Sequence, residues 1–128
     1  MATRQERLGA NIAGGCLLVL FIPSVDRNEN PIDQASWVTA SLKMLGSLFG
    51  GATAFPQGRG VWRDDARSGL LIFDEPTLIQ CYTTEELIDQ QLDAVRDFVI
   101  QMGRATKQGA VGIVIDREYY EIRLGEHS

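Results

Sequence analysis

The sequence predicts a single α+β domain whose elements follow the order β-α-β-β-α-β. Seven consecutive apolar residues, Cys16–Ile22, are typical of a strand buried on both faces of a sheet. Two longer segments repeat apolar residues at helical spacing, and short strand-like runs surround them. A length of 128 residues fits one domain with one core.

The first half of the chain contains a strand and a helix. The strand is predicted over residues 15–25, and a polar turn follows it at 26–31. The helix is predicted over residues 33–49, with Asp33 as its N-cap and the Gly50-Gly51 pair at its end. Its apolar stripe is Val38, Leu42, Leu45 and Phe49. We expect this stripe to face the core.

Two strands are predicted next. Residues 52–64 contain Pro56 and several glycines, which would disrupt a central ladder, so we expect an edge strand there. Residues 69–82 are expected to form the third strand. Pro76 interrupts that segment, which predicts a bulge or a break at this position.

The last elements are a helix and a strand. The helix is predicted to begin at Thr83, with Glu86 completing a capping box, and to end at Gly103 or Gly109. Its apolar stripe is Ile88, Leu92, Val95, Val99 and Met102. One strand is predicted over residues 110–124. We expect Val95 to be buried under this arrangement.

This order of elements resembles the ferredoxin-like split βαβ arrangement over residues 15–124. The resemblance implies an antiparallel sheet with both helices on one face, the first and third strands in the centre, and the other two at the edges. Apolar residues point to both faces of the first strand, so the second face also needs cover. We therefore expect a homodimer of the α+β barrel type, burying more than about 1,000 Å².

Composition limits the classes of partner and the compartment. A net charge of -5 and a pI near 4.8 argue against binding nucleic acid or anionic membranes. Cys16 and Cys81 are expected to be free and buried, so the cytoplasm is the expected location. We expect residues 1–14 to be a flexible or short helical lead, 15–124 the domain, and 125–128 a tail.

Several kinds of chemistry are excluded by the residues present. The only histidine, His127, lies in the expected tail, which excludes Ser-His-Asp and Cys-His catalysis and multi-histidine metal sites. The Gly-rich segments match neither phosphate-binding nor dinucleotide-binding fingerprints. We therefore expect no metal and no cofactor. Carboxylates remain for acid–base chemistry, and the candidates are Glu75 and Asp116, the latter sharing a strand face with Glu118.

The Gly-rich run of residues 50–65 is the strongest candidate for a binding site. Its glycines would allow a ligand to approach the backbone closely. Arg59 and Arg63 would supply charge, Trp62 a stacking face, and Tyr82 a hydroxyl near a helix start. Together they predict a site for an anionic small molecule. The structural alternative is an irregular edge hairpin with Trp62 in the core.

Two functions follow from these patterns. Since no catalytic set stands out, we expect a small dimeric binding or regulatory module. The alternative is a small dimeric α+β barrel enzyme or ligand-binding protein, which would act on an anionic small molecule through Arg59, Arg63 and a carboxylate. A pocket holding a carboxylate beside Trp62 would favour the enzyme, and a flat apolar face would favour the module.

Overall fold

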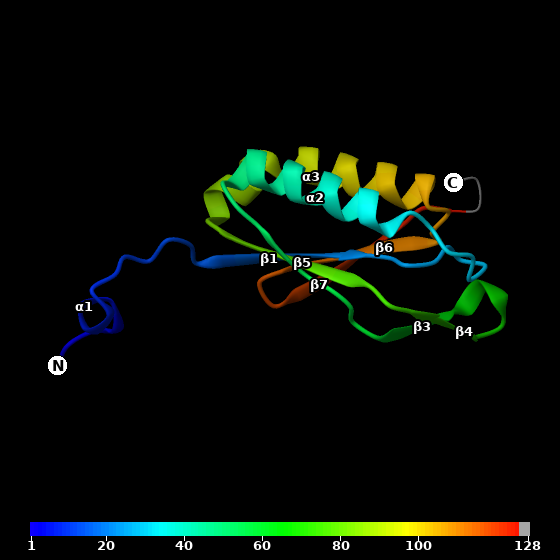
Figure 1. The fold of residues 1–128 in the computed structure, drawn as a ribbon, viewed down its shortest axis with the longest axis horizontal. Coiled ribbons are helices and arrows are strands. Elements are labelled where there is room, and N and C mark those ends of the chain that lie inside the picture. Colours follow the sequence, from blue (N-terminus) through cyan, green and yellow to red (C-terminus); the bar gives the residue numbers. More distant parts are fainter. Residues whose placement is uncertain (126–128) are drawn as a thin grey trace.

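A computed structural model describes residues 1–125 of the chain. They form a mixed α+β fold with three α-helices and an antiparallel sheet of five strands in the order β2-β5-β1-β6-β7 (Figure 1). A separate hairpin pairs β3 with β4. The elements are α1 (Arg4–Leu8), β1 (Cys16–Ile22), α2 (Gln34–Phe49), β2 (Thr53–Phe55), β3 (Gly60–Asp64), the short 3₁₀ helix η1 (Asp65–Arg67), β4 (Leu70–Asp74), β5 (Thr77–Thr83), α3 (Glu85–Ala105), β6 (Ala110–Ile115) and β7 (Glu118–Arg123).

Helices α2 and α3 lie side by side on one face of the sheet (Figure 1). The α2 helix begins after Asp33, whose carboxylate accepts a hydrogen bond from the Ser36 amide at 3.2 Å. It ends at Gly50, which has a φ of 96° and therefore needs glycine's conformational freedom. Both features agree with the prediction from sequence.

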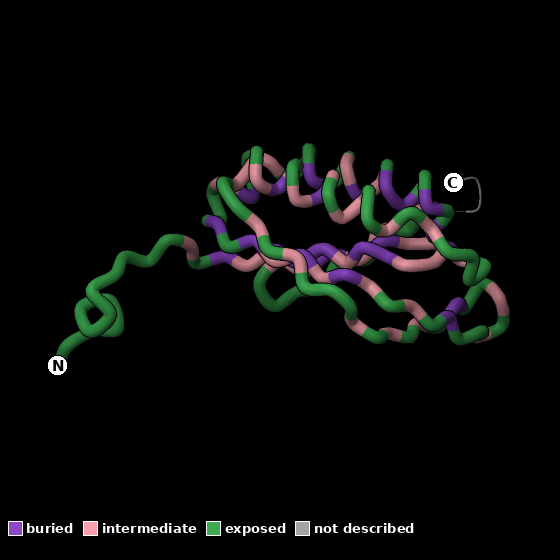
Figure 2. The backbone as a smooth tube through the Cα atoms, in the orientation of Figure 1, coloured by how far each residue is buried: buried purple, intermediate pink, exposed green. Residues whose placement is uncertain are grey.

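The hydrophobic core fills the space between these helices and the sheet. Figure 2 shows the buried positions on the facing sides of the two layers. The central strand contributes every second side chain to it, as expected for a pleated strand. The buried residues of the whole core are Cys16, Leu18, Leu20, Ile22, Leu45, Ile79, Cys81, Ile88, Val95, Val99, Met102, Val111 and Ile113. Phe49 is only partly buried at the edge of this core.

Three segments that were each predicted as one strand contain two shorter strands in the structure. Residues 52–64 divide into β2 and β3, and residues 69–82 divide at Pro76 into β4 and β5, where the break was expected. The last strand, predicted over 110–124, turns at Asp116 and returns as β7. A non-glycine residue at a φ of 55° makes this turn, so no glycine marked it in the sequence. Because β7 pairs with β6, the first half of the fourth predicted strand is an inner strand, and its second half, β7, forms the edge of the sheet.

The boundaries of α3 also differ from the prediction. Its N-cap is Thr84, whose hydroxyl accepts a hydrogen bond from the Leu87 amide at 3.2 Å, whereas Thr83 is the last residue of β5. The helix passes through Gly103 and ends at Ala105, with Thr106 as its C-cap. Gly103 is kept small by close packing, since a Cβ there would overlap the side chains of Val111 and Leu124.

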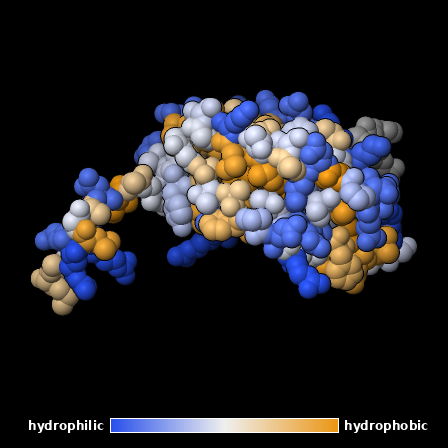
Figure 3. All heavy atoms as spheres, viewed as in Figure 1, coloured by the Kyte–Doolittle hydropathy of each residue, from blue (hydrophilic) through white to orange (hydrophobic). Residues whose placement is uncertain are grey.

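The second face of the sheet is not covered by helices. The β3–β4 hairpin lies beneath part of it, at the end where β1 runs into the loop to α2 (Figure 1). Phe55 and Tyr82 remain 50% and 65% exposed on the rest of this face. The outer side of the hairpin is apolar as well, with Val61, Leu71 and Phe73 more than half exposed. Figure 3 shows apolar atoms gathered at this end of the molecule.

The chain before β1 extends away from the body (Figure 1). Its helix α1 has a complete capping box between Thr3 and Glu6 and ends at Gly9. Of the predicted tail, Gly125 is described, while residues 126–128, including His127, lie outside the described residues. Within residues 1–125, no helix is long and apolar enough to cross a membrane.

Candidate functional site: a groove between the hairpin and the open sheet face

The β3–β4 hairpin is attached to the loop after β1 at its base. The Asp74 carboxylate accepts hydrogen bonds from the Ser24 amide at 2.8 Å and the Ser24 hydroxyl at 2.5 Å. The Ser24 hydroxyl oxygen in turn accepts a bond from the Glu75 amide at 2.9 Å. These bonds fix the end of β4 against the end of β1.

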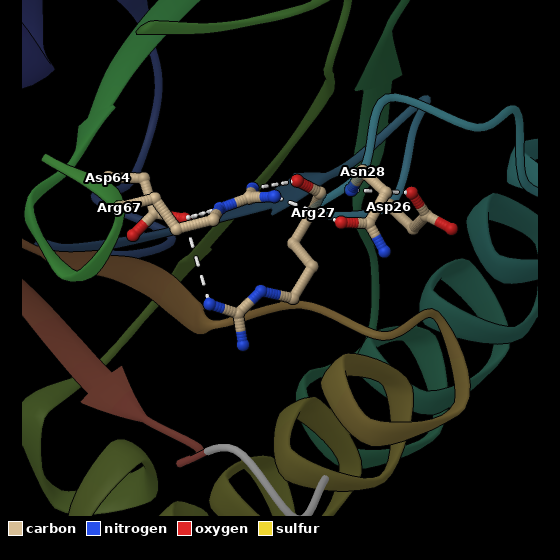
Figure 4. Close-up of polar contacts among 5 residues, drawn as sticks. All are labelled: Asp26, Arg27, Asn28, Asp64 and Arg67. Atoms are coloured by element: carbon tan, nitrogen blue, oxygen red, sulfur yellow. Dashed lines mark hydrogen bonds and ion pairs between the residues drawn. The ribbon is translucent and has the colours of Figure 1, made fainter. Parts of the chain in front are cut away.

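A cluster of charged residues attaches the far end of the hairpin to the same loop (Figure 4). The Asp64 carboxylate accepts a hydrogen bond from Arg67 at 2.7 Å and lies 3.6 Å from the Arg27 guanidinium. Arg67 also donates to the Asn28 side chain at 2.9 Å and to the Arg27 carbonyl. The hydrogen bond from Arg67 holds the pKa of the buried Asp64 below its ordinary value.

Asp26 organises the loop that receives this cluster. Its carboxylate accepts hydrogen bonds from the backbone amides of Asn28 and Asn30, at 2.7 and 3.0 Å. Burial opposes ionisation of Asp26, but these hydrogen bonds prevail and lower its pKa. The loop is therefore preformed, and the hairpin is attached to it at two points.

A groove of about 200 Å³ lies between the hairpin and the sheet. Three aromatic side chains line it: Phe21 from β1, Trp62 from β3 and Tyr119 from β7. Phe21 and Tyr119 meet edge to face, with ring centroids 6.1 Å apart. Tyr119 lies over Gly112, where a Cβ would overlap its ring.

Polar residues also line the groove. They are Asp74, Gln108 from the loop before β6, and Glu121, whose carboxylate lies 3.3 Å from the exposed Arg123 guanidinium. Burial, with the nearby Glu121 charge, raises the pKa of the Tyr119 hydroxyl, so this group stays protonated at neutral pH. The groove therefore combines flat aromatic surfaces with two acidic side chains and an amide.

A second, larger hollow of about 780 Å³ lies where the start of α3 meets the β6–β7 turn. Four carboxylates line it, from Glu85, Asp89, Asp116 and Glu118. The Asp116 carboxylate accepts hydrogen bonds from the Leu17 amide at 3.0 Å, which lowers its pKa, and from the Cys16 thiol at 3.2 Å. Within residues 1–125, no group of acidic, cysteine or histidine side chains is arranged to hold a metal ion.

The environment of the Cys16 thiol at this hollow disfavours a nucleophilic role. It is 1% exposed, and burial together with the hydrogen bond to Asp116 raises its pKa to about 11. The thiolate is therefore scarce at neutral pH. Cys81 is also buried and free.

The predicted site residues are distributed over different surfaces. Trp62 lines the groove, and Arg59 and Glu75 line an adjoining hollow of about 370 Å³. Arg63 pairs with Asp65 at 2.5 Å, with both side chains 68% exposed. Tyr82 pairs opposite Leu17, four positions along β1 from Phe21.

Asp116 lies at the β6–β7 turn, in the other hollow, so it does not share a strand face with Glu118 as expected. The groove also contains residues that the sequence did not indicate. Phe21 was predicted only as one of the apolar residues on the two faces of the first strand, and Gln108 and Gly112 lie in no motif. The signals that could have pointed to the last two are Gly112 within an otherwise apolar strand and the polar Gln108 two positions before that strand begins.

Comparison with known proteins adds a likeness in fold. No family model and no curated protein sequence matches the chain. A solved phage SAM lyase in complex with S-methyl-5'-thioadenosine superposes with a TM-score of 0.67 at 19% identity, covering 88% of this chain and 92% of that one. A phage SAM lyase in its apo state gives a TM-score of 0.60 at 17% identity, covering 86% and 90%. At this identity, the shared property is the fold.

Proposed function

We propose that this chain binds the adenosyl group of S-adenosylmethionine in the groove beside Trp62 and acts on it as a lyase. The observation that carries this proposal is the combination of three aromatic rings and two carboxylates in one groove, on a fold shared with a phage SAM lyase. The neighbour's ligand is a methylthio nucleoside.

The chemistry of the groove suits both parts of such a ligand. A purine stacks on aromatic side chains, and each stacked base contributes about 1–3 kcal/mol. A sulfonium is a cation, which aromatic faces and carboxylates attract and arginine repels. Asp74 and Glu121 supply the negative charge in the groove, and the net charge of -5 favours approach of a cation.

The reaction breaks the bond between the sulfonium sulfur and the amino-acid side chain. The substrate's own carboxylate oxygen bonds to the γ-carbon as the carbon–sulfur bond breaks, so the amino-acid part leaves as a five-membered lactone and no external base or nucleophile is needed. The electron pair of the broken bond stays on sulfur, which becomes a neutral thioether, and the nucleoside product is S-methyl-5'-thioadenosine. The loss of positive charge weakens the attraction to the carboxylates, so the same groove releases product more easily than substrate.

This proposal favours the alternative drawn from the sequence over the regulatory module. An unidentified regulatory partner has no support in the comparisons, whereas a small-molecule ligand does. The proposed ligand is a cation instead of an anion, because the aromatic groove carries carboxylates. An anion site at Arg59 and Arg63 stays a separate prediction.

Two finer predictions are also part of this proposal. The order β2-β5-β1-β6 is the strand order of a ferredoxin-like sheet, with β7 and the β3–β4 hairpin as additions. The exposed apolar residues of the open face and the hairpin support self-association, and we keep a homodimer as the expected assembly.

Titration calorimetry with S-methyl-5'-thioadenosine, and chromatography of S-adenosylmethionine incubated with the protein, test the proposal. We expect saturable binding and release of S-methyl-5'-thioadenosine. Trp62→Ala should weaken binding by about 5- to 150-fold, the equivalent of one stacked base. The matched control is Tyr120→Ala, which alters the acidic hollow. Loss of binding in Tyr120→Ala but not in Trp62→Ala would move the site to that hollow.

A further inference from the structure

Gln108 is a buried amide whose orientation is fixed by its neighbours. The residue is 6% exposed and lies in the loop between α3 and β6. Its side-chain nitrogen lies 2.8 Å from the Val25 carbonyl oxygen and 3.2 Å from the Thr106 carbonyl oxygen. Both partners are acceptors, so the NH₂ end of the amide must face them and both of its hydrogens are used.

The other end of this amide has no donor. Among residues 1–125, none donates a hydrogen bond to Gln108 Oε1, and no fully enclosed side-chain oxygen or nitrogen lacks a partner. Oε1 is therefore reachable from outside the protein. Gln108 is one of the residues that line the groove.

We infer that Gln108 Oε1 faces the groove and is the acceptor that selects adenine there, by taking a hydrogen bond from the exocyclic amino group of the base. This inference rests on the proposed function and names its specificity-determining residue. Trp62, Phe21 and Tyr119 offer faces to any purine, so stacking alone does not distinguish one base from another. A fixed acceptor makes that distinction, because an amino group donates and the carbonyl of hypoxanthine does not.

The surrounding contacts make the acceptor rigid. To present its NH₂ group to a carbonyl-bearing base, the Gln108 amide would have to turn over and place its oxygen against the carbonyls of Val25 and Thr106. Two acceptors facing each other would leave buried polar groups unpaired, which is costly. The side chain therefore cannot adapt to a 6-oxo purine as a freely rotating amide would.

The test compares S-methyl-5'-thioadenosine with S-methyl-5'-thioinosine, which replaces the amino group by a carbonyl oxygen, in calorimetric titrations of the full chain. We expect the inosine analogue to bind about 10- to 100-fold more weakly, the range for leaving a buried acceptor unpaired. The affinity for the N6,N6-dimethyl analogue, which lacks both donor hydrogens, should be lower by a similar factor. The N6-monomethyl analogue keeps one donor hydrogen and is the matched ligand control.

A variant separates recognition from positioning. Gln108→Leu removes the acceptor together with the two bonds to the loop, and circular dichroism reports whether the fold survives. In a folded variant, the ratio of the affinities for S-methyl-5'-thioadenosine and S-methyl-5'-thioinosine should fall toward one. If Gln108 only supported the structure, the variant would bind both ligands more weakly and the ratio would not change. If the variant does not fold, the three analogues on the unaltered chain still decide the question.

The outcomes separate the two proposals. Equal affinity for the adenosine and inosine analogues would overturn the role of Gln108 and leave the proposed function standing. No binding of any of these nucleosides would overturn the proposed function, and the role of Gln108 with it.

Discussion

The two faces of the five-stranded sheet come from the same strands but have different surroundings. On the face under the helices, Leu18, Leu20, Ile22 and Ile79 are at most 1% exposed. On the other face, Tyr82 and Tyr119 are 65% and 61% exposed. The first face carries the core, and the second is partly covered by the hairpin and contains the aromatic groove.

This difference separates stability from binding within a small domain. Side chains packed against α2 and α3 are removed from water when the chain folds, so their burial contributes to the free energy of folding. Apolar side chains on the open face gain little from folding, so they are available to contact a ligand or another subunit. Substitutions on the two faces should therefore change different measurements.

The largest contrast is expected between Leu20→Ala and Tyr82→Ala. Leu20 is fully buried, so its truncation leaves a cavity and should lower the free energy of unfolding by about 2–5 kcal/mol. In protein diluted until it is monomeric, Tyr82→Ala should change it by no more than about 0.5 kcal/mol, because Tyr82 is then in contact with water. Urea denaturation of both variants at that dilution provides the measurement. Similar losses for the two variants would mean that Tyr82 is buried within the folded monomer.

Gly112→Ala should disturb the open face from within. The added methyl group would overlap the Tyr119 ring, so we expect a loss of about 1–3 kcal/mol, together with weaker ligand binding as the groove wall moves. Gly46→Ala is the matched control. No atom lies within 4 Å of its new Cβ, and Gly46 is inside α2, so that variant should gain roughly 0.5–1 kcal/mol. If Gly112→Ala changed neither the free energy of unfolding nor ligand binding, the packing of Tyr119 on this glycine would be contradicted.

Acid should weaken the attachment of the hairpin before it affects the core. The pKa of Asp64 is lower in the folded state than in the unfolded chain, so its contribution is complete above a pH of about 4 and is lost as the pH falls through the folded pKa. We expect Asp64→Asn to lose about 1–2 kcal/mol at neutral pH and to show a shallower acid dependence than the unaltered protein. Denaturant titrations from neutral to acid pH measure both effects, and parallel pH profiles would contradict this role of Asp64.

The smallest effect on folding is expected from Arg59→Ala and Arg63→Ala. Both side chains are exposed in the hairpin region, and Arg63 forms an ion pair with the exposed Asp65. Neither variant should shift the denaturation midpoint, because exposed ion pairs contribute little. A thermal-shift screen with nucleotides and organic acids checks the separate anion prediction. Stabilisation of the unaltered protein, but not of the variants, would establish an anion site there.

Local patterns predicted the helices and the central strand because these elements depend on nearby residues. The cap at Asp33, the stop at Gly50 and the apolar stripe of α3 are each encoded within a few positions, although Leu92, predicted in that stripe, is 38% exposed. The break at Pro76 was predicted for the same reason, since proline cannot donate to a ladder.

The remaining features depend on residues that are distant in the chain. The β6–β7 turn uses Asp116 at a positive φ, stabilised by its bond to the Leu17 amide from the other end of the domain. The hairpin became separate from the sheet because Asp64 and Asp74 attach it to the loop after β1. No local pattern encodes these contacts. The role of Gln108 has the same origin, because its orientation is set by Val25, far away in sequence.

The pairing of β1 also determines the order of events during synthesis. This strand is among the first parts of the domain to leave the ribosome, yet its neighbours come late, since Cys16 pairs with Thr83 and Leu18 with Ile115. At translation rates of about 5–20 residues per second, the first partner follows after roughly 3–13 s. During that interval, the seven apolar residues of β1 have no strand beside them. A segment of this composition, without charge or proline, favours aggregation. The yield of soluble protein should therefore fall when synthesis slows and rise with chaperones that hold nascent chains.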